Sequence, residues 1–345
     1  MGKRVTIQDI ADALGISRNT VSKAINNSDG LADATREKIL QKAVEMGYKQ
    51  FSYVSGLVNA EKDAKSEPTF HGEIALFTTT FLTNSHFASL MLDAFQREIS
   101  QLGYTLNTHR VTPENLADHT LPFTFNRERT SAILCIEMFD LGYDEMVCSL
   151  GLPTLFVDGP SNCCDGMLPA DHLYMDNTSG IMTLVRTMLS KGIERIGFIG
   201  SYCHCRSFFE RYMAFRGAML LAGKNVEERW CINCLGPENI AIRLAELNDL
   251  PQMFICANDF VASDAIQALR ALGKKVPENV LFSGFDDAPE SRMITPPLTT
   301  VHIHTQIMAF SAVHLLMSRI NQPSLDYRTI YTETELIWRA STDPQ

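Results

Sequence analysis

Residues 6–26 read TIQDIADALGISRNTVSKAIN, and this stretch predicts two short helices joined by a tight turn. Thr6 is suited to cap the first helix and Gly15 to end it, because a threonine oxygen accepts from free helix amides and glycine adopts positive φ. Between them, apolar residues recur at helical spacing: Ile7, Ile10, Ala11 and Leu14. Ser17 is suited to cap the second helix. The inner face of that helix consists of Val21, Ala24 and Ile25.

The outer face of the second predicted helix is polar. It presents Arg18, Asn19, Ser22, Lys23 and Asn26. Arginine and lysine donate to guanine and asparagine pairs with adenine in the major groove, and each good contact distinguishes bases by about 1–3 kcal/mol. A third helix is predicted from about Asp33 to Gly47, where Thr35, Arg36 and Lys38 are placed to touch phosphates. Residues 1–50 thus fit a helix-turn-helix DNA-binding module, although any small three-helix bundle would show the same periodicity.

Composition and charge limit the class of protein. The chain has 345 residues, 45% of them hydrophobic, enough for a small module and a larger domain. No apolar stretch reaches 18 residues and the start has no apolar secretion signal, so we expect a cytoplasmic protein with no membrane partner. Nine cysteines, an odd number, favour reduced thiols. The net charge is −10, yet residues 1–50 hold eight Lys/Arg and six Asp/Glu, so the remainder carries about −12; this asymmetry favours phosphate contact by the first module.

From Glu73 onward, short apolar runs alternate with amphipathic helices, a pattern typical of parallel sheets joined by right-handed crossovers. The expected strands are EIALF (73–77), SAILCI (131–136), PTLFVD (153–158), LYMD (173–176), RIGFIG (195–200), QMFICAND (252–259) and VLFSGFDD (280–287). Ligands bind beyond the carboxyl ends of such strands. The polar residues that follow them are therefore candidates for a binding site: Asp158, Ser207, Arg211, Asn258 and Asp286. A cap or loop role explains each of them equally well, and Asp259 and Asp287 are expected to cap helices.

The stretch at 6–26, followed by TREKILQKAVEMGY at 35–48, resembles the DNA-binding headpiece of the LacI/GalR repressor family from Val5 to Tyr48. The resemblance implies that Arg18, Asn19 and Lys23 contact bases. The other DNA-contacting residues are expected to be Thr6, Ser17, Thr20, Ser22, Asn26, Thr35 and Arg36.

The family's headpiece continues into a hinge helix whose leucine enters the minor groove. Here that segment reads KQFSYVSGLVNAEKDAKSEPTF (49–70), which implies Leu57 as the inserted leucine. It departs from the family because Gln50 replaces the usual proline and Gly56 weakens a helix by about 1 kcal/mol. Whether the hinge helix forms is therefore left open.

A second resemblance covers most of the remaining chain. The segments ICANDFVASDAIQALRALGKKVPENVLFSGFDDAPESRMITPPLTTV (255–301), FFERYMAFRGAM (208–219), WRAST (338–342) and DN (176–177) resemble the family's effector domain, a periplasmic-binding-protein-like pair of α/β lobes. It implies effector contacts from Asp158, Ser207, Arg211, Asn258 and Asp286, the residues that strand-end reasoning also selects. His86 and Phe87 stand where the family often has a ligand-stacking aromatic, although TTTFLTNSHF (78–87) departs from its usual Asn-Pro-Phe-Phe form.

The predicted organisation is a helix-turn-helix domain at 1–50, a hinge or linker at 51–70 and an effector-binding and dimerisation domain at 71–345. The N-lobe is expected at about 71–172 and 302–328, and the C-lobe at about 173–301 and 329–345. The resemblance implies a repressor that acts as a homodimer on a pseudo-palindromic operator in the nucleoid. A small-molecule effector, expected to be a sugar, controls its affinity, and no cofactor is expected.

Other classes of function are weighed on particular residues. The spacing of YCHCR (202–206) and WCINC (230–234) leaves open a thiol- or metal-responsive regulator. Its candidate ligands are Cys203, His204, Cys205, Cys231 and Cys234. No GxSxG, P-loop, HExxH or zinc-deaminase motif is present, so an enzyme is not expected. A glycosidase-like carboxylate pair would leave the headpiece unexplained, and a transport binding protein would need an export signal.

Overall fold

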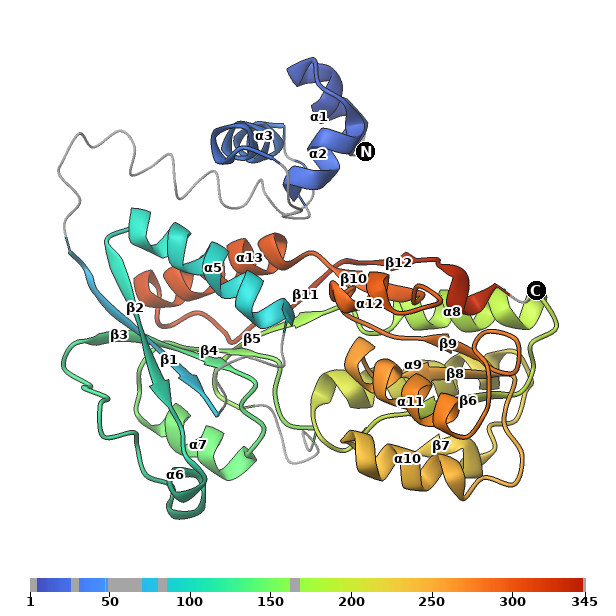
Figure 1. Cartoon of the computed structure of the whole chain (residues 1–345). Coiled ribbons are helices and arrows are strands. Elements are labelled where there is room, and N and C mark those ends of the chain that lie inside the picture. The colour runs from blue at the N-terminus through green and yellow to red at the C-terminus, as the bar shows by residue number, and fades with distance from the viewer. Residues whose placement is uncertain are drawn as a thin grey trace. The chain divides into compact units, whose positions relative to one another are not determined.

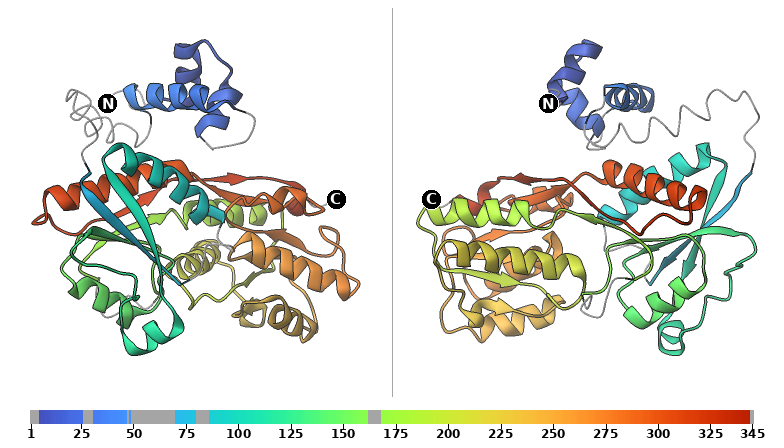
Figure 2. Two further views of the ribbon diagram at one scale, coloured as in Figure 1. Left: turned by 60° about the vertical axis from the view of Figure 1, so that its left-hand side comes forward. Right: turned by 180° about the vertical axis from the view of Figure 1, so that it is seen from behind.

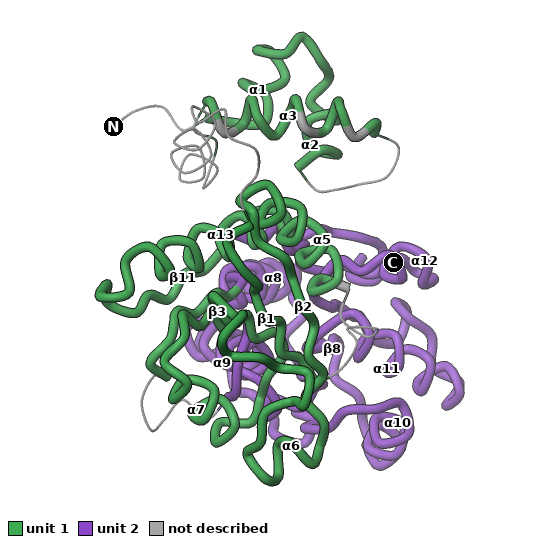
Figure 3. The backbone as a smooth tube through the Cα atoms, turned by 90° about the vertical axis from the view of Figure 1, so that its left-hand side faces the viewer, with its two compact units in different colours: residues 1–157, 167–174, 304–332 green, residues 158–166, 175–303, 333–345 purple. Residues whose placement is uncertain are grey.

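The computed structural model describes residues 5–25, 31–46, 48, 70–79, 86–161 and 168–343. The predicted DNA-contacting residues Asn26 and Leu57, and positions 51–69 of the predicted hinge, lie outside the described residues. Within the described part, none of the helices is both long and apolar enough to cross a membrane. The chain forms two compact units, which consist of residues 1–157, 167–174 and 304–332, and of residues 158–166, 175–303 and 333–345 (Figure 3). We call the α/β part of the first unit the N-lobe and the second unit the C-lobe.

Three helices form the headpiece, namely α1 (Ile7–Leu14), α2 (Arg18–Ile25) and α3 (Asp33–Glu45). The amide of Asp9 donates to Thr6 Oγ1 at 3.2 Å and the amide of Thr6 donates to Asp9 Oδ2 at 2.7 Å, which makes a reciprocal capping box. Gly15 ends α1 with a φ of 65°, and the Thr20 amide donates to Ser17 Oγ at 3.1 Å. The buried core contains Ile10, Ala11, Val21, Ala24, Ile25, Ile39, Leu40 and Ala43. The predicted helices and their caps are confirmed.

The N-lobe is built on a six-stranded sheet in the order β11-β5-β4-β3-β1-β2. Its strands are β1 (Gly72–Thr78), β2 (Tyr104–Arg110), β3 (Thr130–Ile136), β4 (Thr154–Val157), β5 (Asp171–Met175) and β11 (Thr329–Thr332). All pairings from β2 across to β5 are parallel. Helices α5 (His86–Gln101) and α13 (Thr305–Asn321) lie side by side on one face, while α7 (Leu141–Ser149) and the short α6 (Pro113–Asp118) lie on the other (Figures 1 and 2).

The C-lobe has a four-stranded parallel sheet in the order β7-β6-β8-β9. Its strands are β6 (Ile196–Ile199), β7 (Cys231–Ile232), β8 (Met253–Cys256) and β9 (Leu281–Ser283), and an antiparallel pair is formed by β10 (Thr300–Ile303) and β12 (Thr334–Ile337). The helices are α8 (Ser179–Ser190), α9 (Arg206–Leu221), α10 (Pro237–Ala245), α11 (Asp259–Ala271) and the short α12 (Glu290–Met293). Helix α9 covers one face of the sheet, where its Tyr212 and Phe215 contact Phe198 of β6. Helices α10 and α11 share a core on the other face.

The parallel α/β architecture predicted from the apolar runs is confirmed, and each of the seven predicted strands overlaps an observed one. The analysis of apolar runs did not identify β2, β7, β10, β11 or β12. Strand β2 reads YTLNTHR, which is polar enough to resemble a loop, and β7 spans only two residues. Short or polar strands of this kind form because a neighbouring strand is available, so their own sequence indicates them weakly.

Two buried carboxyl groups of the N-lobe, those of Asp171 and Asp144, differ in their hydrogen bonding. Arg319 on α13 donates to both carboxyl oxygens of Asp171 on β5, from Nε to Oδ2 and from Nη2 to Oδ1, at 3.0 Å each. Asp144 on α7 is fully buried, and neither of its carboxyl oxygens has a hydrogen-bond partner among the described residues. Burial, followed by the charge of Asp140, raises the pKa of Asp144 to about 8. Asp144 is therefore protonated in the folded protein at neutral pH.

Replacing Asp144 by leucine is expected to stabilise the N-lobe increasingly as pH rises. Between about pH 4 and 8 the unfolded chain releases this proton while the folded chain keeps it, so wild-type stability falls by up to about 1.4 kcal/mol per pH unit and levels off above pH 8. Asp144→Leu removes that fall. Hydrogen exchange of the β3 and α7 amides, corrected for intrinsic rates, measures it. The matched change Asp118→Asn, at an exposed residue of α6, is expected to leave the pH dependence unchanged. Parallel pH curves for wild type and Asp144→Leu would contradict the assignment.

Candidate functional site

The polar face of α2 is open to solvent in the headpiece. Arg18, Asn19 and Lys23, the predicted base-contacting residues, are all exposed, as are Ser17 and Thr35. Thr20, Ser22 and Arg36 are partly buried. Thr6 is exposed, but its hydroxyl is engaged with Asp9 in the cap of α1. The described residues thus present a helix with two cations and an amide on one outward face, which is the chemistry required for contacts in a major groove.

In the C-lobe, a polar cluster is organised around Arg211 on α9. The side chain of Arg211 is 3% exposed. Its Nε donates to Asn177 Oδ1 at 2.9 Å, and its Nη1 donates to the Ala257 carbonyl at 2.7 Å. The same Nη1 lies 3.6 Å from Asp286 Oδ1. The guanidinium carbon lies 3.5 Å from the ring centroid of Phe285, close enough for a cation–π contact.

Two more predicted residues join this cluster where α9 begins. Asp158 directly follows β4 and adopts a φ of 60°. Its Oδ1 accepts from the amide of Gly159 at 2.9 Å and from the amide of Ser207 at 3.2 Å. Ser207 lies in the first turn of α9, and its hydroxyl donates to Met175 Sδ at 3.4 Å. Asp158 thereby fixes the start of the helix that contains Arg211.

The predicted caps of α11 and α12 are wrong in detail. Asn258, and not Asp259, caps α11, because its Oδ1 accepts from the Val261 amide at 2.9 Å. Asp259 is buried and instead accepts from Thr300 Oγ1 at 2.6 Å and from the amide of Ala288 at 2.8 Å. Helix α12 begins after Pro289 without a side-chain cap.

Asp287 has a different structural role. Its carboxylate contacts Arg292 at 2.8 Å, His302 Nδ1 at 3.0 Å, and Arg339. Burial opposes ionisation, but hydrogen bonds from these three side chains hold the pKa of Asp287 well below its usual range. Asp287 therefore connects α12 to β10 and to the C-terminal segment.

Backbone geometry places Phe285 and Asp286 against Arg211. At Gly284, directly after β9, an added Cβ would lie 2.1 Å from Asp259 Oδ1, so only glycine allows this close approach. Asp286 then adopts a φ of 110°, a conformation that costs an L-residue of order 1–3 kcal/mol. Such strain persists only where the surrounding contacts impose it, and in proteins it is concentrated at binding sites.

The electrostatics of the cluster follow from its burial. Burial raises the pKa of Asp158 and, together with nearby Asp286, raises that of Asp259 well above its usual value. Burial also lowers the pKa of Arg211, although neighbouring carboxylates oppose this effect. The cluster thus combines a cation, carboxyl groups and amides at the ends of strands. Groups of this kind can hold the hydroxyls of a polar ligand in a fixed orientation.

The structure brings Asp158, Ser207, Arg211 and Asp286 together in the C-lobe, and Asn258 adjoins Ala257, whose carbonyl accepts from Arg211. His86 and Phe87 begin α5 in the N-lobe, where Phe87 is buried. The site prediction missed Asn177, which is fully buried and also donates to Glu210 at 2.9 Å. Glu137, which the site prediction also did not name, follows β3 in the N-lobe with a φ of 55°. Both follow predicted strands, so the strand-end rule applied to every strand would have selected them.

The cysteine candidates occupy unlike surroundings in the C-lobe. Cys203 is exposed, Cys205 and Cys231 are buried, and Cys234 is partly buried. Burial, then the charge of Asp158, raises the pKa of Cys205, and burial raises that of Cys231 to about 11. Burial also lowers the pKa of His204. Thiols kept protonated are poor nucleophiles and ligands, and no group of three potential metal ligands occurs among the described residues.

Comparison with known proteins assigns both parts of the chain. Residues 6–50 match the family described as "Bacterial regulatory proteins, lacI family", and residues 185–342 match "Periplasmic binding protein-like domain". The HTH-type transcriptional repressor PurR of Mannheimia succiniciproducens is 28% identical, covering 97% of this chain and 98% of the relative. The HTH-type transcriptional regulator GalR of Lacticaseibacillus casei is also 28% identical, covering 98% of this chain and 99% of the relative.

Solved structures show the same fold. A complex of the transcriptional regulator CelR with cellobiose superposes with a TM-score of 0.68 at 22% identity, covering 98% of this chain and all of that one. The lac repressor dimer bound to operator and the anti-inducer ONPF superposes with a TM-score of 0.64 at 20% identity, covering 99% of each chain. The matched relatives are transcriptional regulators, which confirms the expectation of a regulatory protein and not an enzyme. The headpiece thus matches the lacI family of bacterial regulatory proteins, the α/β domain matches the periplasmic binding protein-like domain, and the relatives that are similar over nearly the full length of the chain are transcriptional regulators.

Proposed function

We propose that this protein is a cytoplasmic, nucleoid-associated repressor that binds a pseudo-palindromic operator as a homodimer and changes its DNA affinity when a small polar effector binds. The observation that supports this most strongly is the Arg211 cluster, in which a buried cation, strained Asp286 and buried Asp158 meet in the C-lobe. The same chain has an exposed polar helix in a lacI-family headpiece. A sensor site and a DNA-binding module in one polypeptide are the two parts that a ligand-controlled repressor requires.

For DNA binding, we propose that α2 enters the major groove and that Arg18, Asn19 and Lys23 contact base edges. Thr6, Ser17, Thr20, Ser22, Asn26, Thr35 and Arg36 are the further proposed DNA contacts, with Leu57 in the minor groove. A dimer would place its two headpieces about 34–36 Å apart, one turn of the duplex. The name of the PurR relative, a transcriptional repressor, supports repression as the direction of control.

For the effector, we propose a sugar held by Asp158, Ser207, Arg211, Asn258 and Asp286, with His86 and Phe87 contributing from the N-lobe. Sugar hydroxyls donate to carboxylates and accept from a guanidinium, so this set of side chains offers partners for both roles. The solved complex of CelR with cellobiose is a regulator of the same fold that binds a sugar.

The proposed control is a shift between two populations of the dimer. An effector that binds one arrangement of the lobes more tightly favours that arrangement and, with it, one separation of the headpieces. A full switch from 1:99 to 99:1 requires about 5.5 kcal/mol of differential affinity. Because a buried charge responds strongly to any change in its partners, the Arg211 cluster is a suitable place for that difference to arise.

Selection of bound DNA from a random duplex library, at a fixed and stated salt concentration, tests the proposed function. We expect enrichment of one pseudo-palindromic site. That site then serves as the fluorescent probe for screening mono- and disaccharides as effectors. A library that stays unenriched across a range of salt concentrations would contradict sequence-specific binding.

Two lysine variants distinguish base contacts from phosphate contacts. Lys23→Ala is expected to relax the preference at one position in each operator half-site, because it removes a base contact. Lys38→Ala, at an exposed residue of α3, is expected to weaken binding evenly across sequences and to reduce the salt dependence. Repeating the selection with both variants measures the base preference, and a salt titration with both variants measures the salt dependence. Identical behaviour of the two variants would refute the assignment of the α2 face.

Asp286→Asn is expected to abolish the effector response while leaving operator affinity within about twofold. The change removes a charge near Arg211 but keeps the side-chain shape, whereas Arg211→Ala would leave buried carboxyl groups uncompensated and cost about 3–5 kcal/mol of stability. Operator binding by anisotropy, with and without the effector found in the screen, measures both quantities. Glu290→Gln, an exposed change on α12, is the matched control and is expected to respond normally. A full response from Asp286→Asn would remove Asp286 from the site.

A further inference from the structure

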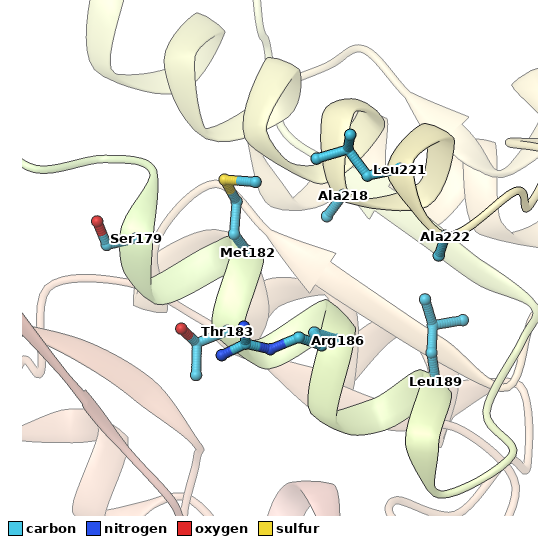
Figure 4. Close-up of a pocket in the computed structure, with 8 residues that line it drawn as sticks. All are labelled: Ser179, Met182, Thr183, Arg186, Leu189, Ala218, Leu221 and Ala222. Atoms are coloured by element: carbon cyan, nitrogen blue, oxygen red, sulfur yellow. The ribbon is translucent and has the colours of Figure 1, made fainter.

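A pocket lies between α8 and α9 in the C-lobe, with a volume of about 510 Å³ (Figure 4). It arises from the spacing of side chains on the two packed helices. Met182, Arg186 and Leu189 lie on one face of α8, and α9 opposes them with Ala218 and Ala222, one turn apart. Because the two alanines are short, they leave space that the longer residues of α8 border without filling.

The lining of this pocket is apolar apart from one end. Leu221, which is 79% exposed, and Met182, which is 37% exposed, form its outer rim. Large apolar side chains exposed in this way have a cost in water that a ligand would relieve. The remaining polar groups are the hydroxyls of Ser179 and Thr183 and the guanidinium of Arg186.

Arg186 is the single charged residue of α8. It is exposed, and no hydrogen bond or ion pair joins it to any other residue in the described part of the chain. This distinguishes it from other arginines of the C-lobe, such as Arg216 and Arg243, which pair with Glu228 and Glu246. The pocket therefore combines an unpaired cation with an apolar lining.

We propose that this pocket binds an amphipathic carboxylate, with its hydrocarbon chain between α8 and α9 and its anionic head on Arg186. The volume lies within the range of about 300–1,000 Å³ usual for small-molecule sites. Charge complementarity fixes the head group, since a carboxylate pairs with a guanidinium through two parallel hydrogen bonds. A second copy of this chain is a poorer occupant, because a two-fold contact through this face would place two Arg186 side chains near one another. The site is separate from the Arg211 cluster and does not depend on the proposed function.

Isothermal titration calorimetry of the full-length protein with decanoate tests the proposal. The decanoate concentration is kept below that at which decanoate forms micelles. We expect saturable binding to wild type at one site per chain. Uncharged 1-decanol is expected to bind about tenfold more weakly, because it lacks the charge-assisted hydrogen bonds. Arg186→Gln is expected to weaken decanoate binding by a similar factor and to remove the difference between the two ligands. Arg243→Gln, an exposed arginine on α10, is the matched control and should bind like wild type.

A second pair of variants tests the apolar part of the pocket. Leu221→Ser, at a lining residue, is expected to weaken decanoate and decanol alike by about tenfold, because it removes most of the apolar contact that a bound hydrocarbon chain would make with the leucine. Leu220→Ser changes a neighbouring leucine of nearly equal exposure, 77%, that does not line the pocket, and should have no effect. Asp286→Asn is expected to keep decanoate binding. Absence of saturable binding, equal affinity for decanol, loss of binding only in Asp286→Asn, or a ligand-independent change in oligomer size in Leu221→Ser would each overturn the proposal.

Discussion

The Arg211 guanidinium lies almost entirely out of water, and such a charge is tolerated only where fixed groups replace its hydration. Those groups come from the ends of several elements: the side chain of Asn177 after β5, the carbonyl of Ala257 after β8, and Asp286 after β9. Two of these partners follow the neighbouring strands β8 and β9, so satisfying one arginine fixes the relative height of these two strands. The C-lobe sheet and the candidate sensor site therefore depend on the same buried charge.

The backbone near this charge departs from regular geometry for the same reason. Gly284 passes so close to Asp259 that no Cβ fits, and Asp158 and Asp286 both adopt positive φ. These conformations cost free energy that regular strand ends would not. Their cost is offset by the contacts made, since Asp158 accepts from the first turn of α9 and so holds the helix that contains Arg211. The strained backbone at Asp158 and Asp286 is therefore held in place by the contacts that surround Arg211.

Local signals explain what the sequence could predict. Thr6, Gly15 and Ser17 act through atoms within a few residues, so the headpiece helices were predictable from the chain alone. The predicted parallel strands were apolar enough to identify, and the strand-end rule then selected most of the Arg211 cluster. Partners across the sheet escape such reasoning. The recruitment of Asp259 by Thr300 and Ala288, and of Asp287 by Arg339, requires contacts far along the chain, and therefore helix caps were predicted instead.

The distribution of charge bears on how a dimer of this chain would be controlled. The headpiece carries a net charge of only about +2 and the remainder about −12, so general attraction to phosphates is modest and the larger domain repels the duplex. For the proposed homodimer, stable binding would then come from specific contacts of two headpieces at once, because the second one benefits from a high effective concentration once the first is bound. That benefit falls steeply when geometry prevents simultaneous contact. In the proposed homodimer, a small change in headpiece separation would therefore be sufficient for release from the operator.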